Sequence, residues 1–136
     1  MNAIDKLLSA IGYPAGEVSP GAVSCTISVD GGDVRLRIDG QRLVLEKALC
    51  RPEDGDGTLE RLAGYAAGRI LREEAVLAWD PQGGELILWQ DVPAASPGDL
   101  LRRVFEVFMA SCDWWLARVA DDAGGASHLP EMVIMP

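Results

Sequence analysis

VSCTISVDGGDVRLRIDGQRLVLEKALC, residues 23–50, is the stretch that decides the fold of this chain. Apolar and polar side chains alternate along residues 23–29 and 34–39, and the leucines at 43, 45 and 49 share one parity. A period of two is typical of a strand with one face in the core and one in water. Gly31-Gly32 and Gly40-Gln41 lie between the runs and favour turns. The stretch therefore predicts a three-stranded antiparallel meander.

The segment before the meander predicts a short amphipathic helix. Asn2 is suited to cap its start, and Gly12 followed by Pro14 is suited to end it. The apolar residues recur at the helical spacing i, i+3, i+4 and i+7, and they are Ile4, Leu7, Leu8 and Ile11. One face of this helix is therefore expected to be apolar.

The segments after the meander predict two more helices and a second hairpin. A loop at residues 51–57 leads to a helix expected from Thr58 to Glu74. Strands are expected at residues 76–80 and 85–92, on either side of a proline- and glycine-containing turn. Ser96 and Pro97 open a long helix that is expected to end near Ala120, before Gly124-Gly125.

Together these elements predict an α+β domain. Their order is α-β-β-β-α-β-β-α, with a twisted antiparallel sheet and helices packed on it. We expect one domain over residues 1–122 and a C-terminal tail over residues 123–136.

Composition indicates a globular protein that avoids anionic partners. The 136 residues are 49% hydrophobic and 24% charged, with a formal net charge of -9. This charge repels phosphate backbones and anionic lipid, so nucleic-acid and membrane partners are disfavoured. No apolar run is long enough for a transmembrane helix, and the N-terminus lacks the features of a signal peptide. The widely spaced Cys25, Cys50 and Cys112 are then expected to be reduced core residues of a cytosolic protein.

Sequence motifs for catalysis or cofactor binding are missing, so we expect no enzyme, no cofactor and no metal. His128 is the only histidine and is expected to be solvated in the tail. Glu73-Glu74 is expected to be a solvated helix end. Residues 54–59, DGDGTL, resemble the middle of a calcium-binding EF-hand loop, but Pro52 and Ala63 stand where that loop needs ligands.

Two of the predicted helices carry more apolar surface than packing within one chain requires. Nearly all of the last helix is apolar outside one polar edge, formed by Asp99, Arg102, Arg103, Glu106, Ala110 and Asp113. A surface helix needs an apolar stripe of only about 100°, so part of this arc must be covered by a partner or left open for a ligand. The helix from Thr58 has two apolar stripes, and Gly64 and Gly68 favour close contact. It can pack on its own sheet or on a twin helix across a two-fold axis, and we favour both.

Up to about residue 122, the chain resembles the class I type III secretion chaperones, the Tir-chaperone-like group. The matching features are the order of elements, the small size, the acidity and a set of apolar motifs. These motifs are Leu7-Leu8-x-x-Ile11-Gly12, Leu86-Ile87-Leu88-Trp89, Val92-Pro93, Leu100-Leu101, Phe105-x-x-Phe108 and Trp115-Leu116.

This resemblance implies a homodimer in the bacterial cytoplasm that binds the N-terminal segment of a secreted effector. Such chaperones keep the effector soluble and extended and target it for export, with the secretion ATPase and its sorting platform as a further partner. The effector fills apolar grooves and adds a strand to the sheet. The implied dimer interface is Leu59, Leu62, Ala63, Ala66, Ala67 and Ile70. The implied effector groove lies between the opening helix and the second hairpin, at Ile4, Leu8, Ile11, Leu77, Trp79, Leu86 and Leu88.

Two alternative functions stay open from the sequence. The first is a dimeric protein-binding adaptor of the same fold that has no role in secretion. The second is a small-ligand-binding domain or a small enzyme, which would need a closed pocket with convergent polar groups. Trp79 and Trp89 bear on the choice, because tryptophan is a favoured interface anchor. One of these two is expected to lie in the core.

Overall fold

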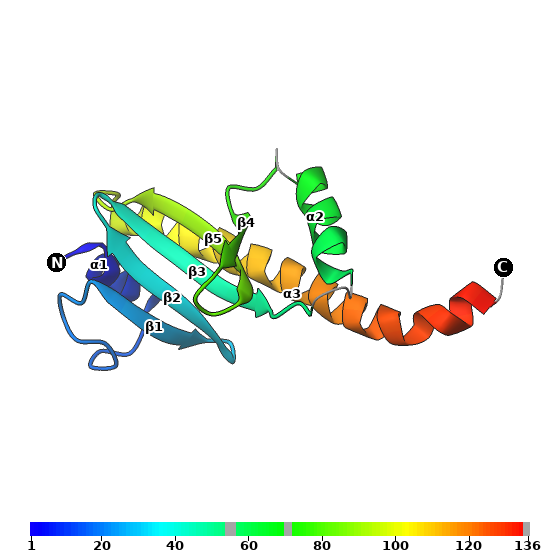
Figure 1. Cartoon of the computed structure of the whole chain (residues 1–136). Coiled ribbons are helices and arrows are strands. Elements are labelled where there is room, and N and C mark those ends of the chain that lie inside the picture. Colours follow the sequence, from blue (N-terminus) through cyan, green and yellow to red (C-terminus); the bar gives the residue numbers. More distant parts are fainter. Residues whose placement is uncertain (54–56, 70–71, 135–136) are drawn as a thin grey trace.

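The computed structural model describes the backbone of residues 1–53, 57–69 and 72–134, and the side chains among them as far as Asp121. The elements follow the predicted order α-β-β-β-α-β-β-α, which confirms the α+β class (Figure 1). They are α1 (Ala3–Ile11), β1 (Ser24–Val29), β2 (Gly32–Asp39), β3 (Arg42–Cys50), α2 (Thr58–Arg69), β4 (Val76–Asp80), β5 (Glu85–Pro93) and α3 (Gly98–Ile134).

The described strands form one antiparallel sheet in the order β1-β2-β3-β5-β4. The predicted meander is confirmed, because β1 pairs with β2 and β2 pairs with β3. Asp30 and Gly31 make the first turn with φ angles of 52° and 79°, the positive pair that a tight hairpin requires. β1 and β4 are the two edges of the sheet, so each has one side without a strand partner.

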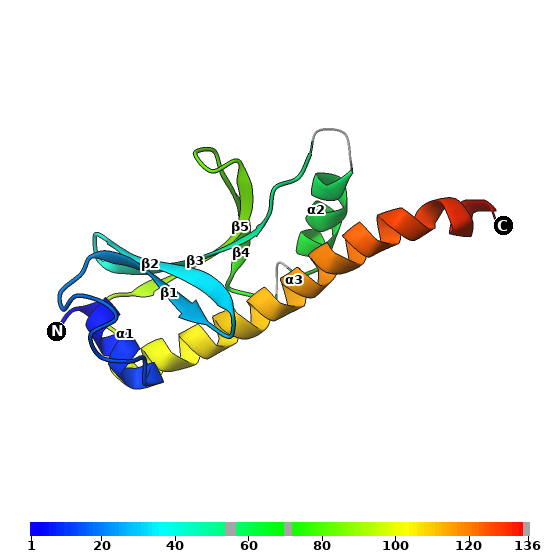
Figure 2. The ribbon, with the colours of Figure 1, turned by 90° about the horizontal axis from the view of Figure 1, so that it is seen from below.

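Two helices cover one face of this sheet. α1 and α3 pack on each other and on the sheet, while α2 stands beyond the end of the sheet beside α3 (Figure 2). The pairing register explains the apolar layer beneath them, because Leu36 lies opposite Leu45 and Leu43 lies opposite Val92. The alternation in the sequence therefore determines which face α3 covers.

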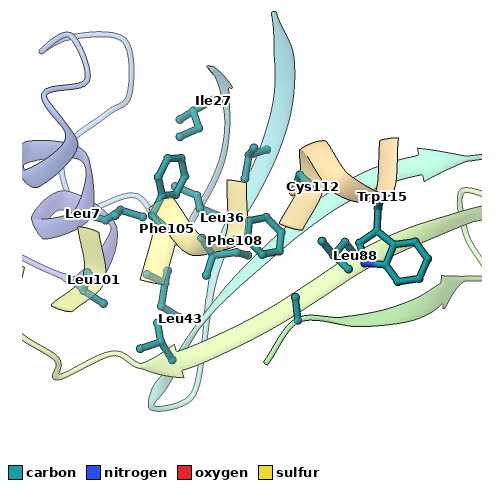
Figure 3. Close-up of a cluster of buried hydrophobic side chains, with 14 of the residues drawn as sticks. Leu7, Ile27, Leu36, Leu43, Leu88, Leu101, Phe105, Phe108, Cys112 and Trp115 are labelled. Atoms are coloured by element: carbon teal, nitrogen blue, oxygen red, sulfur yellow. The ribbon is translucent and has the colours of Figure 1, made fainter. Parts of the chain in front are cut away.

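The hydrophobic core lies between the sheet and the two helices (Figure 3). α3 supplies buried residues at intervals of four, three, four and three, which is the period of one helix face. These residues are Leu101, Phe105, Phe108, Cys112 and Trp115. α1 and the strands supply the opposing side, which includes Ile4, Leu7, Ile27, Val34, Leu36, Leu43, Leu45 and Leu88.

Two helix ends differ from the sequence prediction. α2 is described as far as Arg69, and Arg72, Glu73 and Glu74 are no longer helical, so the predicted end at Glu74 is wrong. The Glu73 side chain bonds to α3 instead, and Ala75 is already buried next to β4. α3 continues to Ile134, so its predicted end near Ala120 is wrong. Each glycine in a helix costs about 1 kcal/mol relative to alanine, but every residue added to a nucleated helix gains a hydrogen bond. The division into a domain at 1–122 and a tail at 123–136 stays a prediction.

α2 packs mainly on α3, and not on the sheet as expected. Leu62 is fully buried, and Ala66 packs against the same core. The Tyr65 ring meets the edge of Trp114 with the ring centroids 6.0 Å apart, and the Arg69 guanidinium lies 3.7 Å from the Trp114 ring. α2 packs on α3 and not on the sheet because α3 runs past the end of the sheet and carries apolar side chains there.

Candidate functional site

α1 is held at both ends by its own sequence, as predicted. Asn2 accepts a hydrogen bond from the Asp5 N–H at 3.0 Å, and the Asp5 carboxylate accepts one from the Asn2 N–H at 3.1 Å. Gly12 ends the helix with a φ of 73°, a left-handed conformation that suits glycine. These caps orient the helix so that Ile4 lies in the core and Leu8 is half-buried at the surface.

Two open hollows flank the segment that connects α1 to β1, residues 12–23. The first has a volume of about 980 Å³ and is bounded by α1 and this segment, with Leu8, Tyr13 and Val18 in its lining. The second has a volume of about 670 Å³ and reaches the end of β1 and α3, with Ile11, Val29 and Phe105 in its lining. Gly12, Tyr13 and Pro14 line both hollows and so form a partition between them.

The edge strand β1 lies beside this partition. The Ile38 N–H bonds to the Val23 carbonyl, and the register continues from there in steps of two. Since alternate residues of an edge strand bond to its neighbour, the main-chain groups of Ser24, Thr26 and Ser28 point to the open side. The Ser28 N–H donates to the Tyr13 hydroxyl at 3.3 Å. A side chain of the connecting segment therefore occupies one donor of the open edge.

The predicted effector-binding residues are divided between surface and core. Trp79 is 51% exposed, and Leu8, Ile11 and Leu77 are half-buried. The other three residues are buried beneath the helices, with exposed fractions of at most 7%, and they are Ile4, Leu86 and Leu88. In this conformation these three stabilise the core, and a partner at the surface does not reach them.

The structure does not join α1 and the second hairpin into one groove. α1 packs on α3 and β2, whereas β4 is the edge of the sheet opposite β1. Trp79 lines a separate hollow of about 410 Å³, together with Ile87 and Trp89. Neither tryptophan belongs to the core, which corrects the expectation that one would. Trp89 faces away from α3 because it lies opposite Glu46, on the charged face of the sheet.

The predicted dimer residues lie on two sides of α2. Leu62 is buried in its own chain and Ala66 is half-buried. Leu59 is 48% exposed, Ala63 and Ala67 are exposed, and Ile70 lies outside the described residues. Gly64 and Gly68 lie on the open side, where no described atom of another segment comes within 4 Å of where a Cβ would stand. α2 therefore presents an open face of small residues.

A polar cluster that the sequence did not predict ties the end of α2 to α3. The Glu73 carboxylate accepts hydrogen bonds from the Arg69 guanidinium, from the Ser111 hydroxyl at 2.8 Å and from the Trp115 indole N–H at 3.4 Å. Burial by itself raises the pKa of Glu73, but these hydrogen bonds outweigh it and hold the pKa below its ordinary value. Glu73 is therefore not the solvated residue that we expected. The spacing of four residues between Arg69 and Glu73 could have indicated their ion pair from the sequence. Nothing in the sequence indicated that Ser111 and Trp115 would bond to Glu73.

The outer face of α3 confirms the predicted excess of apolar surface. Leu100 is 40% exposed and Val107 is 58% exposed. Both line a hollow of about 540 Å³ between α3 and the end of α2, and Arg72 and Arg103 lie in the same lining. The sequence pattern had indicated this surface without showing which side of the helix would stay open.

Side chains suited to chemistry do not gather in the described part of the chain. Among those residues, no group of three His, Cys, Asp or Glu could hold a metal ion. Burial raises the pKa of the Cys112 thiol to about 12, which leaves it protonated and inert near neutral pH. The side chain of His128 lies outside the described residues, as do Asp54, Gly55 and Asp56 of the EF-hand-like stretch. None of the described helices is both long and apolar enough to cross a membrane.

Comparison with known proteins finds likeness in solved structures alone. The sequence matches no family model and no curated protein. One similar structure is the HopA1–SchA chaperone–effector complex, with a TM-score of 0.66 and 20% identity over 85% of this chain and 94% of that chain. Another is the ExoU–SpcU complex from the type III secretion system of Pseudomonas aeruginosa, with a TM-score of 0.61 and 14% identity over 83% and 93% of the two chains.

A third similar structure is the ExoT–SpcS complex from Pseudomonas aeruginosa, with a TM-score of 0.60 and 19% identity over 82% of this chain and 91% of that chain. At these identities the likeness establishes the fold. It covers most of this chain and nearly the whole of each matched chain. The chain therefore has the fold of the type III secretion chaperones, the group that its sequence pattern resembles.

Proposed function

We propose that this chain is a secretion chaperone that binds the N-terminal segment of a type III effector, keeps it extended and soluble, and targets it for export. The observation that carries the proposal is the match over 85% of the chain to a structure described as a chaperone–effector complex. The chain works in the bacterial cytoplasm, and it passes its cargo to the secretion ATPase and its sorting platform.

The surface beside α1 supports a peptide as the ligand. An extended peptide is recognised by main-chain hydrogen bonds to a sheet edge and by pockets for alternate side chains. β1 offers an open edge, the second hollow lies beside it at Ser28 and Val29, and the two hollows next to α1 present apolar groups that include Leu8 and Ile11. Both hollows are open to solvent, which suits a chain that passes through better than an enclosed small ligand.

The open face of α2 supports a homodimer. Ala63 and Ala67 are exposed beside Gly64 and Gly68, and Leu59 extends the same apolar surface. Small residues let two helices approach closely, and a two-fold axis brings the same face of each copy together. We infer that the two chains meet through α2 and that each copy keeps its own α1 groove.

The charge of the chain supports the same assignment. A net charge of -9 keeps a protein with exposed apolar surface soluble. It also repels nucleic acid and anionic lipid, so the partners are proteins.

Co-purification tests the proposal directly. The tagged chain is expressed from its own locus in the bacterium that encodes it, and the proteins that it retains are identified by mass spectrometry. We expect one secreted protein to be strongly enriched, and we expect its N-terminal segment alone to be retained equally well. Deleting the chaperone gene should then stop secretion of that protein and leave other secreted proteins unaffected. Enrichment of no secreted protein under secreting conditions would contradict the proposal.

A further inference from the structure

The edge of β1 is covered at one point by a side chain of the same molecule. The Ser28 N–H points away from β2 and donates to the Tyr13 hydroxyl at 3.3 Å. Open strand edges attract other strands, and proteins protect them with side chains or loops. Tyr13 is half-buried and packs against the core, so its ring is held in place while its hydroxyl reaches the strand.

The connecting segment, residues 12–23, is bonded to α1 on either side of its middle part. At one end the Tyr13 N–H bonds to the Leu8 carbonyl at 2.9 Å. At the other end the Gly21 N–H bonds to the Asp5 carboxylate at 3.1 Å. Gly12, Gly16 and Gly21 have φ angles of 73°, 93° and 76°, and no described atom lies within 4 Å of a Cβ placed on any of them. Val18 in the middle of the segment also packs against the core, so the segment stays in place and only the Tyr13 hydroxyl has to leave Ser28.

We propose that Tyr13 is a displaceable cover of the docking edge. An incoming extended segment of the effector pairs with β1 and takes over the Ser28 N–H from the Tyr13 hydroxyl. This inference rests on the proposed function and adds to it a competition between the chain's own tyrosine and its cargo.

The strength of the contact fits this role. One neutral hydrogen bond at the surface changes an equilibrium constant by roughly two- to tenfold. Such a contact lowers the chance that two edges pair with each other, yet an effector strand that forms several bonds outcompetes it. The cover therefore favours long matching strands over accidental ones.

Hydrogen exchange in the free protein tests the cover without any cargo. Tyr13→Phe keeps the ring and removes the hydroxyl acceptor. We expect the Ser28 amide to exchange roughly two- to tenfold faster in this variant, as measured by NMR. Tyr65→Phe is the matched control, because Tyr65 packs on Trp114 far from β1 in the fold, and it should leave the Ser28 amide unchanged. An unchanged exchange rate at Ser28 in Tyr13→Phe would overturn the proposal.

Binding measurements on two variants, one at each end of this hydrogen bond, distinguish a displaceable cover from a contact that only stabilises the fold. The probe is the effector N-terminal segment recovered by co-purification. Tyr13→Phe should bind it about two- to tenfold more tightly, and Ser28→Pro, which removes the docking donor, should bind it more weakly by a similar factor. Proline is tolerated here because the Ser28 N–H faces the open edge and does not bond to β2. Thr26→Pro provides the same test if Ser28→Pro fails to fold.

The proposal is decided by whether each variant binds the effector segment more tightly or more weakly than the wild type. A structural contact would make both variants bind more weakly, which would overturn the cover. If the wild-type chain retains no effector segment at all, the proposed function fails. The exchange measurement then still decides whether Tyr13 covers the edge.

Discussion

Val107 and Phe108 are neighbours on α3 with opposite environments. Phe108 is fully buried, whereas Val107 is 58% exposed. A helix turns by about 100° per residue, so a single step in sequence moves a side chain from the core to the open face. At the residue scale, then, one position of the helix contributes to stability, and the position next to it is open to a partner.

Phe108→Ala should lower the free energy of unfolding by about 3–5 kcal/mol, because it removes a buried ring and leaves a cavity. Val107→Ala is the matched control and should change the free energy of unfolding by less than about 0.5 kcal/mol. Urea denaturation followed by circular dichroism measures both. Equal losses of unfolding free energy would mean that α3 does not place Phe108 in the core and Val107 on the open face.

Glu73 should make stability depend on pH. Its folded-state pKa is depressed by hydrogen bonds from Arg69, Ser111 and Trp115 in spite of burial. A depressed carboxylate pKa contributes stability that is present above the unfolded pKa and is lost as the pH falls through the folded pKa. Glu73→Gln should therefore be less stable than the wild type at pH 7, and the difference should shrink below about pH 4.

Thermal unfolding between pH 7 and pH 3 measures this difference. Glu106→Gln is the control, because Glu106 is 66% exposed in its ion pair with Arg102 and exposed pairs contribute little. If the wild type stays more stable than Glu73→Gln by the same amount down to pH 3, the cluster does not stabilise the charged form of the carboxylate.

At the scale of elements, α2 has one side in its own chain and one side open. Leu62 and Ala66 pack toward α3, while Ala63 and Ala67 lie on the exposed side. The packed side lies on α3 rather than on the sheet, and the homodimer contact of the exposed side stays a prediction.

Ala67→Glu should convert the proposed dimer to a monomer, because it places an unpaired charge in a close helix contact. Light scattering should give about 29 kDa for the wild type, twice the chain mass of 14.6 kDa, and about half of that for the variant. Ala110→Glu, at an alanine that is also exposed but lies on the polar edge of α3, should stay dimeric. A wild type that is a monomer at every concentration tested would contradict the dimer.

α1 should carry cargo binding through its half-buried side. Leu8→Asp should weaken retention of the effector segment by at least tenfold, because it places a charge in the apolar lining of the first hollow. Gln41→Asp, at an exposed turn residue that lines neither hollow, should have little effect. Isothermal titration measures both affinities, and light scattering checks that both variants keep the oligomeric state of the wild type. Normal binding by Leu8→Asp would move the cargo site to the outer face of α3, where Leu100 and Val107 are exposed.

At the scale of the whole molecule, the chain combines an acidic surface with several apolar hollows. The charged face of the sheet is paired within itself, as Arg37 with Glu46 and Arg42 with Asp91. The hollows beside α1 are lined mainly by apolar groups. Recognition is therefore expected to depend on burial of apolar surface more than on charge.

Binding of the effector segment should show a strongly negative heat-capacity change and a modest dependence on salt. Ordering a flexible segment costs roughly 1–2 kcal/mol of backbone entropy for each residue that is fixed, so the affinity must come from a large buried area. Calorimetry at several temperatures and at low and moderate salt measures both quantities. Loss of binding between low and moderate salt would show that recognition is electrostatic.

The amino-acid sequence by itself determined the element order, the strand alternation, both caps of α1 and the excess apolar arc of α3. These features follow from local periodicity and capping, which act over a few residues. The tertiary structure alone decided that β5 lies between β3 and β4, which places Trp79 far from α1. It also decided that Glu73 binds α3 and that Tyr13 reaches Ser28. Such contacts join residues that are distant in sequence, and they form only when packing brings those residues together.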